Sequence, residues 1–274
     1  MAEPPRVVWF EDETCRDVAC AGGKGASLAA MTALGLPVPP GFVIPASTLE
    51  RSVDAERLRE LAAAGDHAGA EGLVAHADPP REAILVAYAR LGEGPVAVRS
   101  SACAEDSETA SYAGQQETFL NVSGGDELCR RIVECWASFF SERALFYRGQ
   151  KGALDDLRMA VVVQKMVEPK KSGVLFTVDP VQRRGDRMIV EAIFGLGEDL
   201  VSGHATPDHY VVDRAGASKR EHLPNGGVLE GAELAALADL GRSLEEQFGV
   251  PQDIEWAIAD GQVFLLQSRP VTTL

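Results

Sequence analysis

The 274-residue sequence has few basic residues and no long apolar stretch. Lysine and arginine number 26 against 41 acidic residues, which gives a formal net charge of −15, and they form no basic run. Because binding to a phosphate backbone needs a basic face, we expect no nucleic-acid partner. The sequence also lacks a run of about 18 apolar residues, a secretory signal and a lipidation motif. We therefore expect no membrane partner.

Cysteine and histidine are scarce too, with five of each. The cysteines are odd in number and form no C-x-x-C pair, which argues against a zinc site or a disulfide framework. Reduced thiols instead predict a cytoplasmic protein. The scattered histidines are expected to have surface or packing roles; they are His67, His76, His204, His209 and His222.

Two familiar catalytic motifs are missing as well. The P-loop pattern G-x-x-x-x-G-K-[ST] is absent, and no serine has a G-x-S-x-G context. Ser100, Ser101 and Ser107 have no histidine nearby in the sequence, so we expect no serine nucleophile. The segment FGLGEDLVSG is not a Rossmann turn, because its third glycine is misplaced.

The residues that are present predict an α+β protein with two lobes. The composition is 46% hydrophobic and 24% charged, as in globular proteins. Up to about Leu157 the pattern is mostly helical, and a polar, glycine-punctuated stretch at 105–119 is a candidate flap. After Leu157 four strand-like runs follow in close order, which predicts a mostly antiparallel second lobe. We expect approximate lobes at 1–157 and 158–274 within a single domain.

The expected helices are 25–34, two within 49–90, one or two within 127–150, and 231–248. Trp136, Phe139 and Phe146 are expected in the core.

The C-terminal segment DIEWAIADGQVFLLQSRP predicts a hairpin with two possible registers. A two-residue turn at Asp260-Gly261 pairs Ile258 with Val263 and sets Glu255 opposite Leu266. A three-residue loop with a bulge at Gly261 sorts polar from apolar side chains better, so we prefer it. It places Ile254, Trp256, Ile258, Phe264 and Leu266 on one face, and Asp253, Glu255, Gln267 and Arg269 on the other.

The polar face of this hairpin has two interpretations. It is either a solvated outer surface, the more common case for a hairpin, or a cluster that offers oxygen ligands to Mg²⁺ and a cation to phosphate. The stretch ACAGGKGASLAAM, 19–31, is equally ambiguous: Lys24 among glycines before a helix either holds an anion or is a solvated lysine beside a helix cap.

The sequence resembles one family over nearly its whole length. Six segments match in order: GGKGASLAAM…GLPVPPGFVI, VAVRSSACAEDSETASYAGQQETFLNV, QKMVEPKKSGVLFTVDP, EAIFGLGEDLVSG, PDHYVVDR and DIEWAIADGQVFLLQSRPVT. They are similar to the ATP-binding domain at the N-terminus of phosphoenolpyruvate synthase, pyruvate phosphate dikinase and rifampicin phosphotransferase. The resemblance implies an ATP-grasp fold with a nucleotide cleft between two lobes, ATP and Mg²⁺ as cofactors, and ATP-dependent phosphotransferase (kinase) activity.

The resemblance also implies roles for individual residues. Lys24, Arg99 and Arg269 correspond to phosphate-contacting cations, and Glu255 and Gln267 to Mg²⁺ ligands, with Asp253 nearby. The glycine-bearing flap over the triphosphate matches Gly114, Gln115, Gln116 and Thr118. The linker whose backbone meets adenine matches Gln164, Lys165, Met166 and Val167. Glu168, Glu191 and Glu198 are either ribose contacts or loop acids.

The phosphoryl acceptor is left open. The family places a swivelling domain with a phosphorylated histidine after the position where this sequence ends, and none of the five histidines has a similar context. Three hypotheses follow: transfer of a phosphoryl or diphosphoryl group to a histidine on another domain or chain, direct phosphorylation of a small molecule, and a non-catalytic nucleotide-binding module. The intact set of cations and Mg²⁺ ligands argues against the third.

Overall fold

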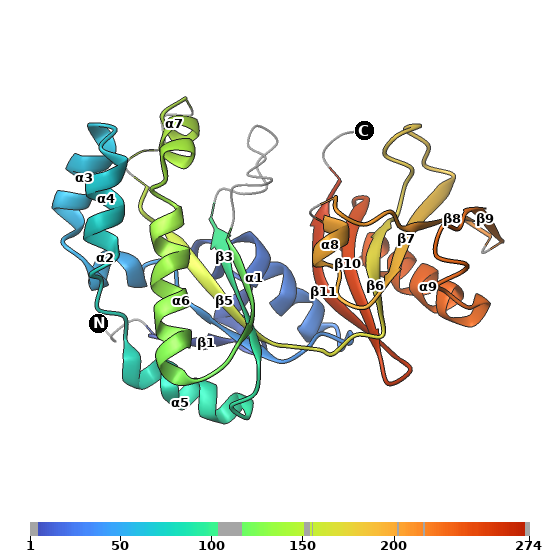
Figure 1. The fold of residues 1–274 in the computed structure, drawn as a ribbon, viewed down its shortest axis with the longest axis horizontal. Coiled ribbons are helices and arrows are strands. Elements are labelled where there is room, and N and C mark those ends of the chain that lie inside the picture. The colour runs from blue at the N-terminus through green and yellow to red at the C-terminus, as the bar shows by residue number, and fades with distance from the viewer. Residues whose placement is uncertain are drawn as a thin grey trace. The chain divides into compact units, whose positions relative to one another are not determined.

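The chain forms two compact units, each with its own antiparallel sheet (Figure 1). The computed structural model describes residues 5–103, 117–150, 154, 156–201, 203–215 and 217–271. The first unit comprises Met1–Gly35 and Pro40–Met166, and the second comprises Leu36–Pro39 and Val167–Leu274. The α+β class and the antiparallel sheet of the second lobe are confirmed.

The first unit contains a five-stranded sheet in the order β1-β2-β5-β3-β4. Its strands are β1 (Val8–Trp9), β2 (Gly41–Ile44), β3 (Val96–Ala102), β4 (Thr118–Val122) and β5 (Met159–Lys165). The middle strand β5 reads Met-Ala-Val-Val-Val-Gln-Lys and is buried along all but its last residue, as a strand covered on both faces should be.

Helices lie on both faces of this sheet. The helices of the first unit are α1 (Val18–Ala33), α2 (Thr48–Ser52), α3 (Ala55–Ala63), α4 (His67–Val74), α5 (Arg81–Leu91), α6 (Gly125–Ser138) and α7 (Glu142–Gln150), with a 3-10 turn at Glu13–Arg16. A side chain at Gly25 of α1 would contact Val43 and Val162, so α1 lies on the face that bears these valines. The residues of β5 on either side of Val162, Val161 and Val163, point to the opposite face and pack into the core cluster together with α6.

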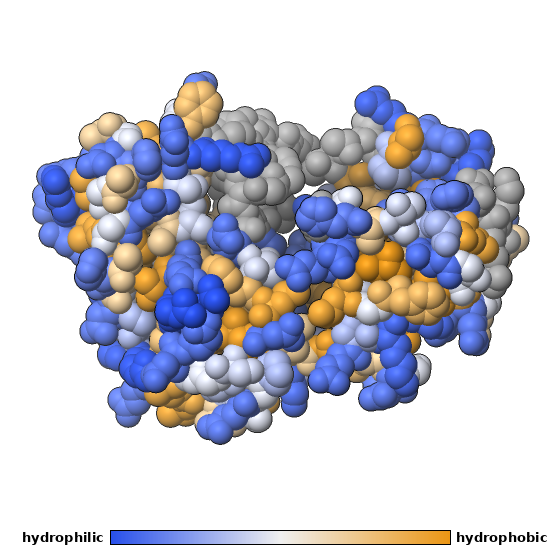
Figure 2. Space-filling view, in the orientation of Figure 1, coloured by the Kyte–Doolittle hydropathy of each residue, from blue (hydrophilic) through white to orange (hydrophobic). Residues whose placement is uncertain are grey.

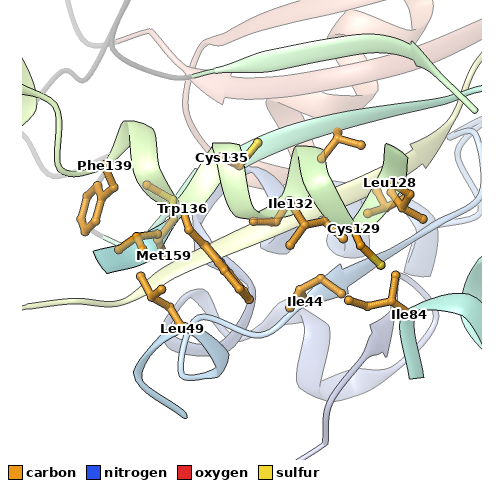
Figure 3. Packing of buried hydrophobic residues seen from close by; sticks show 14 of the residues in the cluster. Ile44, Leu49, Ile84, Leu128, Cys129, Ile132, Cys135, Trp136, Phe139 and Met159 are labelled. Carbon is orange, nitrogen blue, oxygen red and sulfur yellow. The ribbon is translucent and has the colours of Figure 1, made fainter. Parts of the chain in front are cut away.

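The main core of this unit lies under α6 (Figure 3). Ile132 and Trp136 point from α6 toward Ile44, Leu49 and Met159, and all are almost fully buried. The predicted core positions Trp136 and Phe139 are confirmed. Phe146 on α7 is 71% exposed, so its assignment to the core was wrong.

The second unit contains a six-stranded sheet in the order β11-β10-β6-β7-β8-β9. Its strands are β6 (Lys171–Phe176), β7 (Arg187–Phe194), β8 (Asp208–Asp213), β9 (Ser218–His222), β10 (Gln252–Ala259) and β11 (Gln262–Pro270), and its helices are α8 (Glu198–Val201) and α9 (Gly231–Phe248). Helix α9 has the predicted bounds and begins with a capping box between Glu230 and Glu233. A side chain at Gly241 of α9 would contact Leu175, so α9 covers the face of the sheet that bears Leu175.

Two boundaries differ from the sequence predictions. The division between units falls after Met166 rather than at 157, because β5 pairs with β2 and β3 of the first sheet instead of joining the strands that follow it. The region 49–90 contains four helices rather than two, because short turns at 53–54 and 64–66 separate α2, α3 and α4 before α5 begins.

The hairpin turn also differs from the preferred prediction. Ala259 pairs with Gln262, so the turn is the two-residue Asp260-Gly261 type, with φ angles of 50° and 77°. The extra residue lies within the strands instead: Glu255 pairs with Gln267, but Trp256 pairs with Leu265. The polar face was therefore predicted correctly, whereas Phe264 and Leu266 do not face Trp256 and Ile254.

The face shown in Figure 2 is mostly hydrophilic, and the cysteines are not paired in disulfides. Apolar patches lie between the hydrophilic residues on this face. Within the described part of the chain, no helix is long and apolar enough to cross a membrane. The five cysteines are free thiols, and burial raises the pKa of Cys15 to about 12.

Candidate functional site

Lys24 lies just after a break in helix α1. Gly22 has φ 68° and ψ 174°, a conformation that only glycine adopts easily, so the helical turn at 18–21 stops and a new helical run starts at Gly23. Lys24 is 9% exposed and its Nζ donates a hydrogen bond to the carbonyl of Ser100 at 3.2 Å. The interpretation of Lys24 as a solvated lysine is therefore wrong.

Three further predicted residues share the α1 face of the first sheet. Arg99 pairs with Val162 and with Thr118, and Gln164 lies two positions after Val162 on β5. Since directly paired residues share a face and alternate residues do too, all of them lie on the face that α1 covers. Gln164 is buried, Arg99 is half-buried and Thr118 is exposed. The fold thus brings a lysine, an arginine, a hydroxyl and an amide to one side of this sheet.

The predicted adenine linker is the chain segment that joins the two units. The backbone N–H of Lys165 donates to Pro40 and that of Met166 donates to Pro95, both at 2.9 Å. Lys165 is exposed, and Met166 and Val167 are half-buried. The segment is therefore held to the first unit through its backbone at two consecutive residues.

Most of the predicted flap lies outside the described residues. Gly114, Gln115 and Gln116 belong to that part of the chain, as does most of the stretch 105–119. The described residue Glu117 ties the start of β4 to β3, because its carbonyl accepts from the N–H of Ser100 at 3.1 Å and from the Ser100 hydroxyl at 3.3 Å.

The four predicted residues of the second unit form two adjacent cross-strand pairs. Glu255 of β10 lies opposite Gln267 of β11, and Asp253 lies opposite Arg269. On the other side, Glu255 pairs with Val174 and Asp253 pairs with Phe176 of β6. Val174 and Phe176 alternate with Leu175 along β6, so they point away from α9. The four polar residues that pair in line with them therefore lie on the face opposite α9. The bulge within β11 makes this arrangement possible, because it brings Gln267 rather than Leu266 opposite Glu255.

Burial and charge distinguish the two pairs. Asp253 Oδ2 accepts a hydrogen bond from Arg269 Nε at 2.9 Å. Burial raises the pKa of the Asp253 carboxyl, Arg269 opposes this rise and the neighbouring Glu255 carboxylate adds to it. Gln267 is buried and Glu255 is half-buried. Arg269 therefore balances the Asp253 charge at the edge of the cluster, while Glu255 and Gln267 place two oxygen-bearing groups side by side.

The polar face continues across the sheet. Val174 pairs with Glu191 of β7, and Glu191 pairs with His209 of β8, whose Nδ1 lies 3.6 Å from Glu191 Oε1. Glu191 thus lies on the same face as Glu255 with one strand between them. Glu168 and Glu198 are not part of this row of paired residues.

Two negative observations limit the choice of site. Within the residues that the structure describes, no three His, Cys, Asp or Glu side chains are grouped to hold a metal ion. A cavity of about 490 Å³ opens in the first unit among residues such as Arg81, Asp126 and Arg130, and no predicted site residue lines it.

Sequence reasoning overlooked the residue that fixes the Lys24 turn. Ser101 is fully buried on the same face of β3 as Arg99, and its hydroxyl contacts α1 on both sides of Gly22. Period-two alternation from Arg99 would have indicated that Ser101 faces α1. It was instead considered only as a nucleophile.

Comparison with known proteins gives a consistent result. The family model described as "Pyruvate phosphate dikinase, AMP/ATP-binding domain" matches residues 18–225 and 216–274. A probable phosphoenolpyruvate synthase from Archaeoglobus fulgidus is 41% identical over 98% of this chain and 42% of its own length. A rifampicin phosphotransferase from Streptomyces sviceus is 42% identical over 94% of this chain and 35% of its own length. A solved D-alanyl-alanine synthetase A from Vibrio cholerae aligns with 90% of this chain and 57% of its own at 13% identity and a TM-score of 0.40.

The chain thus spans less than half the length of these curated relatives. The family match covers almost all described residues and includes every predicted site position, from Lys24 to Arg269. The chain therefore belongs to the pyruvate phosphate dikinase AMP/ATP-binding domain family.

Proposed function

We propose that this chain is an ATP-grasp domain that binds MgATP and donates a phosphoryl or diphosphoryl group to a histidine on a separate swivelling domain or partner chain. The observation that carries the proposal is the direct pairing of Glu255 with Gln267, flanked by Asp253 and Arg269, on the sheet face opposite helix α9. A solvated outer surface would not need a bulge that aligns these oxygens.

The phosphate contacts come from cations that the fold gathers. Lys24 is held at the start of a helical run, where N–H groups and the helix dipole favour an anion. Arg99 lies on the same face of the first sheet, and its planar fork suits bidentate contact with phosphate oxygens, while Lys24 acts as a point charge. We propose that both of these residues contact the triphosphate of bound ATP, and that Arg269 is a further phosphate-contacting arginine. In a chain of net charge −15, these cations offset the charge of the nucleotide locally.

Glu255 and Gln267 fit the coordination chemistry of Mg²⁺. Magnesium prefers oxygen ligands and takes one or two protein carboxylates or amides together with phosphate oxygens and water. The two side chains supply such a partial set, one carboxylate and one amide oxygen, on paired residues of β10 and β11. Bound Mg²⁺ would neutralise phosphate charge that develops during transfer.

The adenine contact is assigned to Gln164–Val167. The N–H groups of Lys165 and Met166 are already bonded to Pro40 and Pro95, so this segment presents a fixed backbone edge rather than a loose loop. Phosphoryl transfer depends mainly on positioning and charge neutralisation, and no side chain here is required as a covalent nucleophile. The flap residues Gly114, Gln115 and Gln116 remain assigned to the triphosphate. A cytoplasmic location remains a prediction.

The test is a magnesium titration of ATP binding by calorimetry. Glu255→Gln keeps the size of the side chain but removes the charge, and we expect at least about a tenfold increase in the Mg²⁺ concentration needed for half-maximal binding. The matched control is Glu246→Gln, an exposed glutamate on α9, which should leave the titration unchanged. An unchanged titration for Glu255→Gln would remove the magnesium assignment.

Product analysis then identifies the acceptor class. With MgATP, release of AMP only after addition of a histidine-bearing partner domain supports the proposal. Release of ADP with a small acceptor indicates direct phosphorylation instead. Absence of nucleotide binding at millimolar ATP refutes both activities.

A further inference from the structure

The hydroxyl of Ser101 joins two parts of helix α1 that Gly22 separates. Ser101 Oγ donates to the carbonyl of Ala21 at 2.8 Å and accepts from the N–H of Gly25 at 3.2 Å. A serine hydroxyl has one donor and two acceptor positions, so one side chain makes both contacts at once. The contacts lie on either side of the break in the helix.

The position of these contacts is that of a helix cap. When the helical run starts at Gly23, Gly22 is the N-cap residue and Gly25 is the third residue of the run. An N-cap side chain normally accepts from the N–H of the second or third residue. Gly22 has no side chain, and the hydroxyl of Ser101, from a distant strand, accepts this N–H in its place.

The glycine and the serine are sterically matched. A Cβ on Gly22 would lie 2.2 Å from the carbonyl oxygen of Ser101 and 2.3 Å from its Oγ. Ser101 therefore fills the space that a conventional capping side chain at position 22 would need. This clash is a second reason, besides the positive φ, for a glycine at position 22.

Lys24 is enclosed by the same contacts. It is the second residue of the capped run, between Gly22 and Gly25, and its Nζ bonds to the carbonyl of Ser100, the neighbour of Ser101 on β3. Ser101 of β3 thus holds the backbone of this turn, and Ser100 of the same strand holds the lysine ammonium. A displacement of the turn would move the ammonium with it.

We propose that Ser101 is a positioning residue of the phosphate site, which acts through Lys24 by capping the helical turn that carries it. This inference rests on the proposed role of Lys24 in phosphate binding. A merely structural cap would lower stability but would change ATP and AMP affinity equally, and its effect would not depend on Lys24. A positioning residue lowers affinity for ATP selectively, because the terminal phosphates are where Lys24 acts.

The experiment is a double-mutant cycle on binding of ATP and AMP, measured by calorimetry with Ser101→Ala, Lys24→Ala and the double variant. We expect Ser101→Ala to raise the dissociation constant of ATP by roughly three- to thirtyfold, the range that corresponds to loss of a helix cap, with less than about a twofold change for AMP. In the Lys24→Ala background the same substitution should have no further effect on ATP. Ser138→Ala, which removes a hydroxyl bonded to the carbonyl of Cys135 at 2.8 Å in the same unit, is the control and should change neither constant.

The outcomes separate this inference from the proposed function. Equal loss of ATP and AMP affinity, or additive effects of the two substitutions, overturns the positioning role. If Lys24→Ala itself leaves ATP affinity unchanged, the proposed function of Lys24 fails and the inference fails with it. If Ser101→Ala does not fold, Ser101→Cys keeps a weaker hydrogen-bonding group of similar size, and an unchanged ratio of ATP to AMP affinity in that variant overturns the inference.

Discussion

Asp208 is a fully buried carboxylate whose replacement by asparagine should destabilise the second unit. Its Oδ1 accepts from the N–H of Asn225 at 2.7 Å, and its Oδ2 accepts from Gly227 at 2.8 Å and Val228 at 2.7 Å. The Tyr210 hydroxyl adds a longer bond of 3.3 Å to Oδ2. The side chain thus fixes the loop that leads from β9 to α9.

The magnitude follows from counting acceptors. Asparagine has a single oxygen, which can replace Oδ2, and its amide nitrogen then faces the N–H of Asn225. One donor is left without an acceptor, at a cost of about 1–3 kcal/mol, and the remaining bonds lose the assistance of the negative charge. We expect a loss of about 2–4 kcal/mol in the free energy of unfolding, equivalent to roughly a 30- to 1,000-fold change in the opening equilibrium.

The assay is amide hydrogen exchange at Asn225, Gly227 and Val228. Burial opposes ionisation of Asp208, but the backbone N–H donors and the Tyr210 hydroxyl outweigh it and lower the pKa below its ordinary value. The stabilisation is therefore present above the unfolded-state pKa and is lost as the pH falls through the folded-state value. Wild type and Asp208→Asn should differ most near neutral pH and converge in acid.

The control is Asp239→Asn. Asp239 is a largely exposed carboxylate paired with Arg242, and its replacement should lower the free energy of unfolding by less than about 1 kcal/mol. Unchanged exchange at the three amides in Asp208→Asn would show that the Asp208 carboxylate does not hold this loop.

Three other predictions test separate parts of the molecule. Arg99→Ala should weaken ATP binding by about 10- to 100-fold and AMP binding much less, because charge-assisted contacts to phosphate are lost; equal losses in calorimetry would contradict the assignment. Gly173→Ala should cost about 3 kcal/mol or more in urea unfolding, since its Cβ would lie 1.9 Å from the carbonyl of Glu191, whereas Gly185→Ala meets nothing within 4 Å and should be neutral. Arg148→Met should lower the free energy of unfolding by about 2–4 kcal/mol in thermal unfolding, because the buried guanidinium donates to the carbonyls of Phe139, Leu154 and Asp156. The control is Arg143→Met at an exposed arginine, and equal melting temperatures of Arg148→Met and the wild type would count against this role.

Local signals predicted the elements whose partners are close in the sequence. Helix α9 was predicted with its observed bounds because apolar periodicity, a first-turn glutamate and a terminal glycine all agree there. The Asp260-Gly261 turn followed the ordinary rule for two-residue hairpins, and the preferred three-residue loop was wrong. Its polar face was nevertheless right, because a one-residue shift from the regular two-residue register, whether at the loop or at the bulge in β11, puts Asp253, Glu255, Gln267 and Arg269 on one face.

Long-range contacts explain what the sequence could not predict. Strand β5 has the same apolar character as the strands after it, and only its pairing with β2 and β3 assigns it to the first sheet. The match between Gly22 and Ser101 joins positions that no local pattern relates. In each case the decisive partner is distant along the chain, and period and propensity carry no information about it.

The most direct test of the account is a crystal structure of the chain with magnesium and a non-hydrolysable ATP analogue. We expect triphosphate oxygens within hydrogen-bond distance of Lys24 Nζ and the Arg99 guanidinium, and a magnesium ion coordinated by Glu255 and Gln267. A triphosphate that contacts neither cation, or an ion bound by other residues, would contradict it.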